Sequence, residues 1–272
     1  MKRIILVLIS VAALLPACKK NGSSSSKQLL LSKVIYDDKP ESEFTYNSDG
    51  QLVVEKYYNE ENGSWQLTSH HLYVYDANGN PKEMLSYNMP ENVLSARYVY
   101  TVNAQGKILR NSIYDMDGAD SGTLNFHIGH EYNAHRRLIK KTWKDENEDV
   151  QTVVNLNLYP NGNLRTSETF YEFGTPEKVW GSSYGPSDTT LPASFYNIKV
   201  YPINYYYPYL VGQSIRSFTY DDGAVTGETR IEFSGRKYNN KGLVTEQTIT
   251  HKNIKPAAPD EVHTIRFEYV QF

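Results

Sequence analysis

Hydrophobic and polar residues alternate along several stretches of this chain. In residues 65–75 the large apolar side chains fall on odd positions, namely Trp65, Leu67, Tyr73 and Tyr75. Near the end of the chain, apolar residues at 265, 267 and 269 alternate with charged residues at 266 and 268. A period of two places alternate side chains on opposite faces of an extended backbone, so both stretches are predicted to be half-buried strands. No stretch of a dozen residues shows helical periodicity.

A short motif recurs between these strands and predicts tight turns. An aromatic residue is followed by Asn or Asp, by Gly four positions after the aromatic residue, and then by an apolar residue. Seven full, degenerate or shortened copies are present: Tyr46–Leu52, Tyr75–Pro81, Val102–Ile108, Tyr132–Leu138, Tyr159–Leu164, Tyr220–Val225 and Tyr238–Leu243. Gly and Asn tolerate the positive φ that hairpin turns require. Between 46 and 159 the copies start 27 to 30 residues apart, which fits two strands and two turns but is too short for a βαβ unit.

The repeat therefore predicts an all-β fold, an antiparallel meander of repeated hairpins that forms a curved sheet or a barrel-like shell. A flat sheet of this size would leave long edges and one apolar face exposed, which favours curling or closure. A β-sandwich is the alternative. We expect one repeat domain over residues 29–272.

The motif copies resemble the YD repeats of Rhs-type proteins, whose hairpins wind into a β-shell. Residues 75–79, with the letters YDANG, are the best match. Together with the N-terminal segment described next, the Tyr-rich composition also resembles uncharacterised repeat lipoproteins of Bacteroidota. That resemblance implies a cell-envelope protein and supplies no catalytic residues.

The first residues predict export and lipid anchoring. Lys2 and Arg3 precede twelve uncharged residues, too few for a membrane-spanning helix, and the sequence LPAC at 15–18 resembles a bacterial lipobox. We expect a signal peptide at 1–17, acylation of Cys18, and a flexible tether at 18–28. Lys19 in place of Asp favours the outer membrane, and the choice of leaflet stays open.

The amino-acid composition limits the classes of partner and metal site that the chain can have. The 28 basic and 31 acidic residues give a net charge of −3, so there is no positive field for nucleic acid. The single Cys allows no internal disulfide and no thiolate cluster for zinc. No cofactor, metal or catalytic residue is expected. A weak calcium candidate consists of alternating acids at a hairpin tip, Asp115, Asp117 and Asp120.

Residues 171–212 depart from the repeat and are predicted to form an irregular Tyr- and Pro-rich insertion. Proline removes a donor from a sheet ladder, and irregular loops on a β scaffold often carry function. Its exposed aromatic residues are candidates for stacking on sugar rings or on a partner protein: Trp180, Tyr184, Tyr201, Tyr205, Tyr206, Tyr207 and Tyr209. The same rings could instead be core. Thr189, in an Asp-Thr-Thr sequence, resembles a Bacteroidota O-glycosylation acceptor.

These features predict an outer-membrane lipoprotein with a binding or scaffolding role toward a glycan or an envelope protein. One alternative is a hydrolase of envelope or dietary polysaccharide, with Asp115, Asp117 and Glu172 lining a groove. Another is a purely structural module that pairs its sheet edges with a neighbour.

Overall fold

The structure is a computed structural model that describes residues 29–116, 122–160, 164–172, 176–185 and 214–271. Over these residues it contains strands and no helix. The strands are β1 (Leu29–Tyr36), β2 (Lys39–Tyr46), β3 (Leu52–Glu61), β4 (Ser64–Tyr75), β5 (Pro81–Asn88), β6 (Val93–Val102), β7 (Ile108–Asp115), β8 (Thr123–Tyr132), β9 (Leu138–Asp145), β10 (Val150–Leu158), β11 (Leu164–Tyr171), β12 (Glu177–Tyr184), β13 (Ser214–Asp221), β14 (Ala224–Tyr238), β15 (Val244–Lys255) and β16 (Glu261–Gln271).

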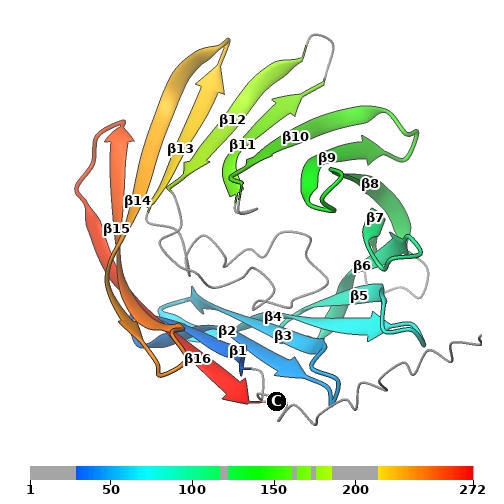
Figure 1. Ribbon diagram of the computed structural model, residues 1–272, viewed down its shortest axis with the longest axis horizontal. Helices are drawn as coiled ribbons and strands as arrows, with labels where there is room; N and C mark the ends of the chain where they lie inside the picture. Colours follow the sequence, from blue (N-terminus) through cyan, green and yellow to red (C-terminus); the bar gives the residue numbers. More distant parts are fainter. Residues whose placement is uncertain (1–28, 117–121, 161–163, 173–175, 186–213, 272) are drawn as a thin grey trace, which may run out of the picture.

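All sixteen strands belong to one closed antiparallel barrel (Figure 1). Each strand pairs with its neighbours in sequence, and β1 closes the sheet against β16, from Leu29 opposite Gln271 to Tyr36 opposite Ile265. The predicted antiparallel meander with a barrel-like shape is confirmed. The β-sandwich alternative is wrong, because a single sheet closes on itself. The edge-pairing alternative loses its basis too, since every described strand has a partner on both sides.

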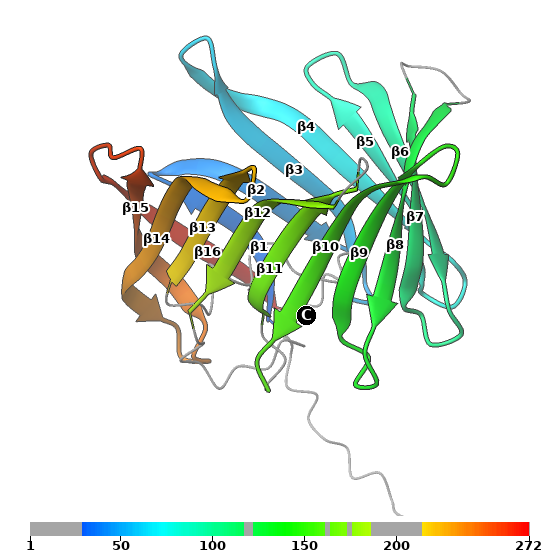
Figure 2. The same cartoon turned by 90° about the horizontal axis from the view of Figure 1, so that it is seen from above.

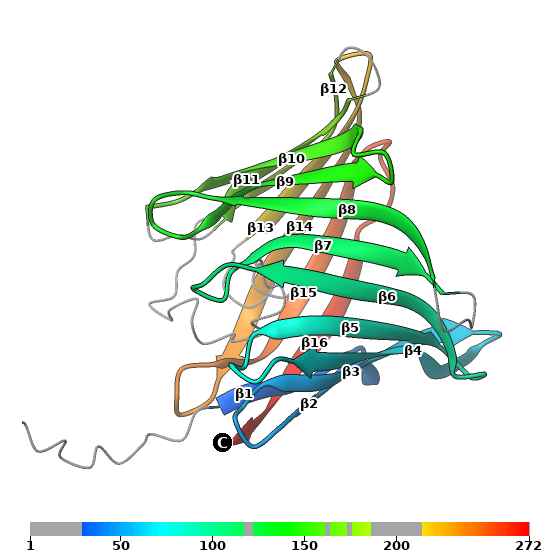
Figure 3. The same ribbon diagram turned by 90° about the vertical axis from the view of Figure 1, so that its right-hand side faces the viewer.

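The hairpin turns gather at the two ends of the strands, as Figure 3 shows for β6 to β11. One end, which we call the repeat rim, holds the turns at 47–51, 76–80, 103–107, 133–137 and 239–243. The other end, the far rim, includes two-residue turns with positive φ at 37–38, 62–63 and 222–223. The predicted copy at Tyr220 is therefore not a copy of the motif. Its Asp222 and Gly223 form a tight turn at the far rim.

The five turns of the repeat rim named above share one pattern of hydrogen bonds. In the first, the N–H of Asn47 donates to the carbonyl of Gln51 at 2.9 Å, and the N–H of Gly50 donates to the carbonyl of Asn47 at 3.0 Å. The Asn47 Oδ1 also accepts the N–H groups of Asp49 and Gln51. Gly50 has a φ of 71°, and Arg136, which replaces glycine in its copy, has a φ of 60°. The Asn or Asp of the motif is thus the acceptor that closes the turn.

The motif tyrosines stabilise this rim by a second kind of bond. The hydroxyl of Tyr75, at the end of β4, donates to the carbonyl of Leu52 at 2.7 Å. Leu52 lies next to a register shift between β2 and β3, and the β3–β4 ladder begins only at Val54. Its carbonyl is therefore beyond the ladder, and the tyrosine replaces the missing partner. Equivalent bonds join Tyr46 to Leu31 and Tyr132 to Ile108. Tyr269, near the end of β16 and outside the motif copies, donates to the carbonyl of Val244 in the same way.

The register of the sheet separates an inner and an outer wall. Tyr73, Met84, Tyr98 and Ile113 are directly paired across β4 to β7 and lie on one face, which also carries the buried Val34. In a barrel of one layer, side chains are shielded from solvent on the side of the lumen, so this face is the inner wall. Its apolar core gathers side chains from β1 to β7, β15 and β16.

The outer wall carries ion pairs around the barrel. Cross-strand examples are Lys33–Glu43, Arg97–Glu83, Lys140–Glu131, Lys178–Glu168, Arg216–Glu228 and Lys252–Glu232. Several of these residues sit in mid-strand, where a barrel embedded in lipid carries an apolar band. The outer wall therefore carries charges at positions where such a band would be apolar. Separately, none of the described residues forms a helix of the length and apolarity needed to cross a bilayer.

The predicted start of the insertion at residue 171 is wrong. Residues 177–184 form β12, a regular strand that pairs with β11 and β13. Pro176 precedes this strand rather than interrupting it, and residues 177–184 contain no proline, so the ladder is not broken. Residues 186–213 lie outside the described residues.

Candidate functional site

A single rung of directly paired residues crosses the inner wall from β8 to β14. Its members are His130, Lys141, Val154, Thr169, Trp180, Thr219 and Gly227. In Figure 2 the neighbouring strands β8 to β14 run side by side across this part of the wall. The rung brings one positive charge and one large aromatic ring to the same inner face. These are the polar and aromatic groups that a ligand in the lumen would meet.

A pocket of about 330 Å³ opens where this rung reaches β12, β13 and β14. Its lining combines the ring of Trp180 with four residues that carry hydroxyl or amide groups, namely Ser217, Thr219, Thr229 and Asn253. Pro256 and Ala258, from the turn after β15, line it at the far rim, and the remaining lining residues are Phe218, Gly227, Glu228 and Lys255. A largely apolar concave surface with a few polar groups is the usual form of a small-molecule site.

Trp180 is held by a hydrogen bond of its indole N–H and is partly exposed. The indole N–H donates to Ser182 Oγ at 3.0 Å, and Ser182 Oγ is 3.0 Å from Ser217 Oγ. These bonds fix the orientation of the ring, yet 42% of the residue is exposed. A large hydrophobic side chain held rigidly and left exposed in a concave surface is suited to stacking against a flat apolar face of a ligand.

Gly227 gives the pocket its depth. A Cβ at this position would lie 2.2 Å from Thr219 Oγ1, so any other residue would have to displace Thr219. A glycine within a strand often marks such a close approach, and this was the one sequence signal for the β13–β14 side of the pocket. Ser217, Thr229 and Asn253 carry no sequence signal, because hydroxyl and amide residues are common on both faces of any strand.

The other predicted aromatic residues divide into two groups. Tyr184 also points to the inner wall, directly opposite Ile215, and its carbonyl accepts the hydroxyl of Tyr159 at 2.9 Å. It is therefore built into the structure of the repeat rim rather than into the pocket. The remaining candidates lie outside the described residues, as do the predicted glycosylation and lipidation sites: Tyr201, Tyr205, Tyr206, Tyr207, Tyr209, Thr189 and Cys18.

The acidic candidates do not converge within the described residues. Asp115 ends β7 and accepts a hydrogen bond from Asn125 at 3.0 Å, while Glu172 follows β11. Four strand spacings of ~4.8 Å separate β7 from β11, or roughly 19 Å along the wall, well beyond the carboxyl separation of glycosidases. Asp117 and Asp120 lie outside the described residues, which contain no group of three potential metal ligands.

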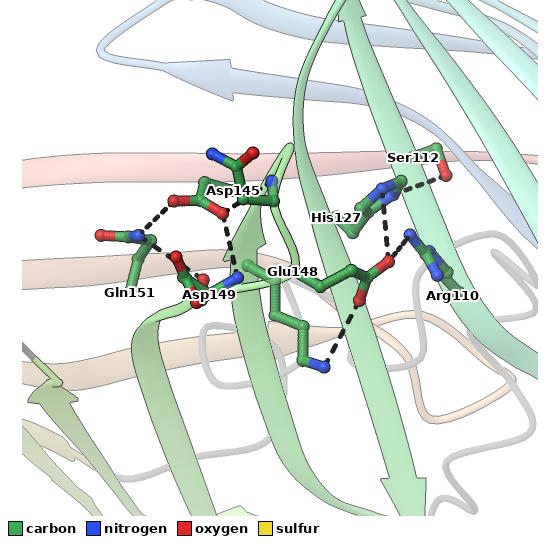
Figure 4. Close-up of polar contacts among 9 residues, drawn as sticks. Arg110, Ser112, His127, Asp145, Glu148, Asp149 and Gln151 are labelled. Atoms are coloured by element: carbon green, nitrogen blue, oxygen red, sulfur yellow. Dashed lines mark hydrogen bonds and ion pairs between the residues drawn. The ribbon is translucent and has the colours of Figure 1, made fainter.

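A serine, a histidine and a glutamate meet on the outer wall (Figure 4). Ser112 Oγ is 2.8 Å from His127 Nδ1, and His127 Nε2 is 3.7 Å from Glu148 Oε1. The second distance is too long for the hydrogen bond that orients a catalytic histidine. Glu148 instead binds the guanidinium of Arg110 and lies 3.4 Å from Lys144 Nζ. Burial and the charge of Arg110 lower the pKa of His127.

This outer cluster is better described as the anchor of a turn. The turn at 145–149 repeats the chemistry of the repeat rim, since Asp145 Oδ1 accepts the N–H groups of Asn147 and Asp149. Glu148 occupies the position of the motif glycine, with a φ of 66°. Arg110 and Lys144 lower the pKa of Glu148 through hydrogen bonds. The carboxylate of Glu148 at this acidic tip is thus paired with neighbouring cations.

No protein-family model matches the chain, and neither does any curated protein. Among solved structures, it is similar to a porin-like protein from Bacteroides uniformis, with a TM-score of 0.55 and 17% identity over 90% of this chain and 96% of that one. The two chains share a fold. A porin-like protein from Bacteroides vulgatus matches with a TM-score of 0.38 and 10% identity, covering 89% and 99% of the two chains. The Tc holotoxin pore of Photorhabdus luminescens matches with a TM-score of 0.25 and 10% identity, covering 82% and 14%.

Proposed function

We propose that this protein is a binding shell that holds a saccharide in the pocket at Trp180. The observation that carries the proposal is the exposed Trp180 in the pocket lining beside the hydroxyl and amide groups of Ser217, Thr229 and Asn253. A sugar ring has an apolar face that stacks on an aromatic ring and a rim of hydroxyls that pair with polar side chains. A rigid aromatic side chain gives such a ligand a large contact area at little cost in conformational entropy, and small polar neighbours supply hydrogen bonds.

The cell envelope is the location that we propose for this shell. The lipobox ending at Cys18 supports acylation, and the tether at 18–28 leads directly to β1, which starts at Leu29. Ion pairs on the outer wall favour a barrel that stands in water beside the membrane rather than within it. The fold shared with a Bacteroides protein described as porin-like is consistent with this location.

The hydrolase alternative receives less support from the pocket. Retaining and inverting glycosidases both need two carboxyl groups that face each other across the bound sugar. The only carboxylate among the described lining residues is Glu228, and it is hydrogen-bonded to Arg216 on the outer wall at 2.6 Å.

The proposal is tested with the mature chain 18–272 carrying Cys18→Ser, which retains every strand of the barrel. A glycan array identifies bound saccharides, and isothermal titration calorimetry measures their affinity for the parent and for Trp180→Ala. We expect a loss of at least about tenfold in affinity, the value of one aromatic stacking contact. Tyr87→Ala removes a ring from the outer wall, where Tyr87 stacks on His70, and should leave affinity unchanged. Equal affinities for the parent and Trp180→Ala would refute the site.

A further inference from the structure

A second group of polar and aromatic side chains lies on the inner wall, where β7, β8 and β9 meet. We call it the His130 cluster, and it consists of Asn111, Ile128, His130, Lys141 and Trp143. Asn111, Ile128 and Trp143 are directly paired across the three strands. His130 and Lys141 form the next pair along β8 and β9, so the five residues occupy adjacent positions on one face.

Several polar atoms of this cluster lack partners. His130 is only 7% exposed, yet its Nδ1 is buried without a hydrogen bond, as is Asn111 Oδ1. The ammonium of Lys141 lies 5.9 Å from the centre of the Trp143 ring, and no carboxylate in the described part of the chain forms an ion pair with it. Buried polar groups are normally satisfied, and a shielded cation is normally paired. The cluster therefore has the composition of a site that lacks its ligand.

The charges of the cluster indicate the sign of that ligand. Burial lowers the pKa of Lys141. Burial and the charge of Lys141 lower the pKa of His130 to about 4, so the imidazole is neutral at pH 7. Lys141 is then the only charged member of the cluster. An anionic group beside its ammonium would supply the missing counter-charge, while hydroxyls of the same sugar would donate to the unpartnered acceptors Asn111 Oδ1 and His130 Nδ1.

The cluster and the pocket are connected along the rung described above. Lys141, Val154, Thr169 and Trp180 are directly paired in succession, so three strand spacings of ~4.8 Å place Lys141 roughly 14 Å from Trp180. The two residues between them carry short, uncharged side chains. A short oligosaccharide stacked on Trp180 can therefore extend along the inner wall to Lys141 without meeting a carboxylate on this rung.

We propose that the saccharide bound by this protein is anionic, with a carboxylate or sulfate group held by Lys141 and neighbouring hydroxyls donated to His130 and Asn111, while another ring stacks on Trp180. This inference rests on the proposed function and specifies its class of ligand. Lys141 selects for charge, and Trp180 binds the sugar whatever its charge.

The experiment compares matched ligands with the mature chain carrying Cys18→Ser. Calorimetry measures the affinity for an oligogalacturonide, for its methyl ester, in which the same rings carry no charge, and for a sulfated oligosaccharide. The two charged ligands distinguish a carboxylate from a sulfate as the bound group. We expect at least one of them to bind about tenfold more tightly than the methyl ester, the value of one charge-assisted contact.

Variants separate this inference from the proposed function. Lys141→Met should remove the preference for charge while leaving the affinity for the methyl ester unchanged, and Trp180→Ala should weaken all ligands. The matched control is Lys140→Met, because Lys140 is adjacent in sequence but pairs with Glu131 on the outer wall at 3.1 Å. Thermal melts confirm that each variant is folded. A preference for charge that survives in Lys141→Met, or no preference in the parent, overturns the inference alone. Failure of the parent to bind any saccharide overturns the proposed function as well.

Discussion

The hydroxyl of Tyr132 donates a 2.7 Å hydrogen bond to the backbone carbonyl of Ile108. Ile108 lies beyond the start of the β7–β8 ladder, which begins at Arg110. The pair shows why most copies of the motif place a tyrosine ahead of the turn. The ring of Tyr132 lies on the inner wall, and its hydroxyl satisfies a backbone carbonyl of the neighbouring strand β7.

Tyr132→Phe should destabilise the barrel by ~1–3 kcal/mol, because the carbonyl of Ile108 is then left shielded and unpaired. Urea unfolding monitored by circular dichroism measures the change. Tyr87→Phe on the outer wall is the matched control and should stay within ~0.5 kcal/mol of the parent. Equal effects of the two substitutions would show that the hydroxyl contributes nothing.

Alkaline pH should weaken the same bonds. Burial raises the pKa of Tyr132 to about 12, above the value of ~10 for an unfolded tyrosine. A raised folded-state pKa contributes stability that is complete below pH ~10 and is lost as the pH rises toward about 12. We expect the melting temperature to fall across this window, and Tyr132→Phe to show a smaller fall. A melting temperature that is constant from pH 9 to 12 would contradict the assignment.

Gly106→Ala should be more damaging than Gly223→Ala. Both glycines have a positive φ, 72° and 73°, so both substitutions carry a similar backbone strain of ~1 kcal/mol. A Cβ at Gly106 would also lie 2.5 Å from Asn80 Oδ1, whereas a Cβ at Gly223 meets nothing within 4 Å. The difference in unfolding free energy isolates the contact between successive turns. If the two variants are equally stable, that contact has no energetic role.

Arg136→Gly should stabilise the protein by ~0.5–1 kcal/mol. Arg136 is held at a φ of 60°, where a Cβ is unfavourable and glycine is not. The same unfolding experiment measures the gain. A loss of stability would indicate that the side chain of Arg136 makes a contribution larger than its backbone strain.

His130 should remain neutral to unusually low pH. Burial and the charge of Lys141 lower its pKa to about 4, so its contribution to stability is complete above pH ~6.5 and is lost as the pH falls toward 4. Histidine NMR shifts followed from pH 7 to 3.5 measure the pKa directly. Lys141→Met should raise this pKa. A pKa near 6.5 in the parent would show that His130 is not shielded.

Cys18→Ser should abolish incorporation of labelled palmitate and release the protein from the membrane fraction in the native host. Fractionation and fluorography follow both outcomes. Label that persists in the variant would place the acylation elsewhere and contradict the lipobox interpretation.

Local chemistry explains how much of the fold was predictable. The period of two around Tyr73 and the Asn-to-Gly spacing of the turn at Asn47 each specify a backbone conformation from adjacent residues alone. They predicted strands, reversals and antiparallel order. They also misassigned the turn at Tyr220, because Asp-Gly fits a two-residue turn as well as the longer motif turn.

Closure of the barrel and the position of the pocket depend on pairings between strands that are far apart in the sequence. Nothing near Leu29 predicts that it lies opposite Gln271, since that pairing results from the accumulated twist of the sheet. The pocket is similar, because Trp180 and Asn253 come from different strands that only the register brings together. Trp180 could be proposed from the sequence as a single aromatic residue, but Asn253 and the His130 cluster required coordinates.

The direction of the first strand has a consequence for access to the protein. β1 starts at the repeat rim and runs to the far rim, so the acyl chains proposed on Cys18 would be attached to the same end as the repeated motif turns. The pocket, with Pro256 and Ala258 at its mouth, lies at the opposite end. In an anchored molecule the pocket would then lie at the end of the barrel farther from the point where the tether is attached.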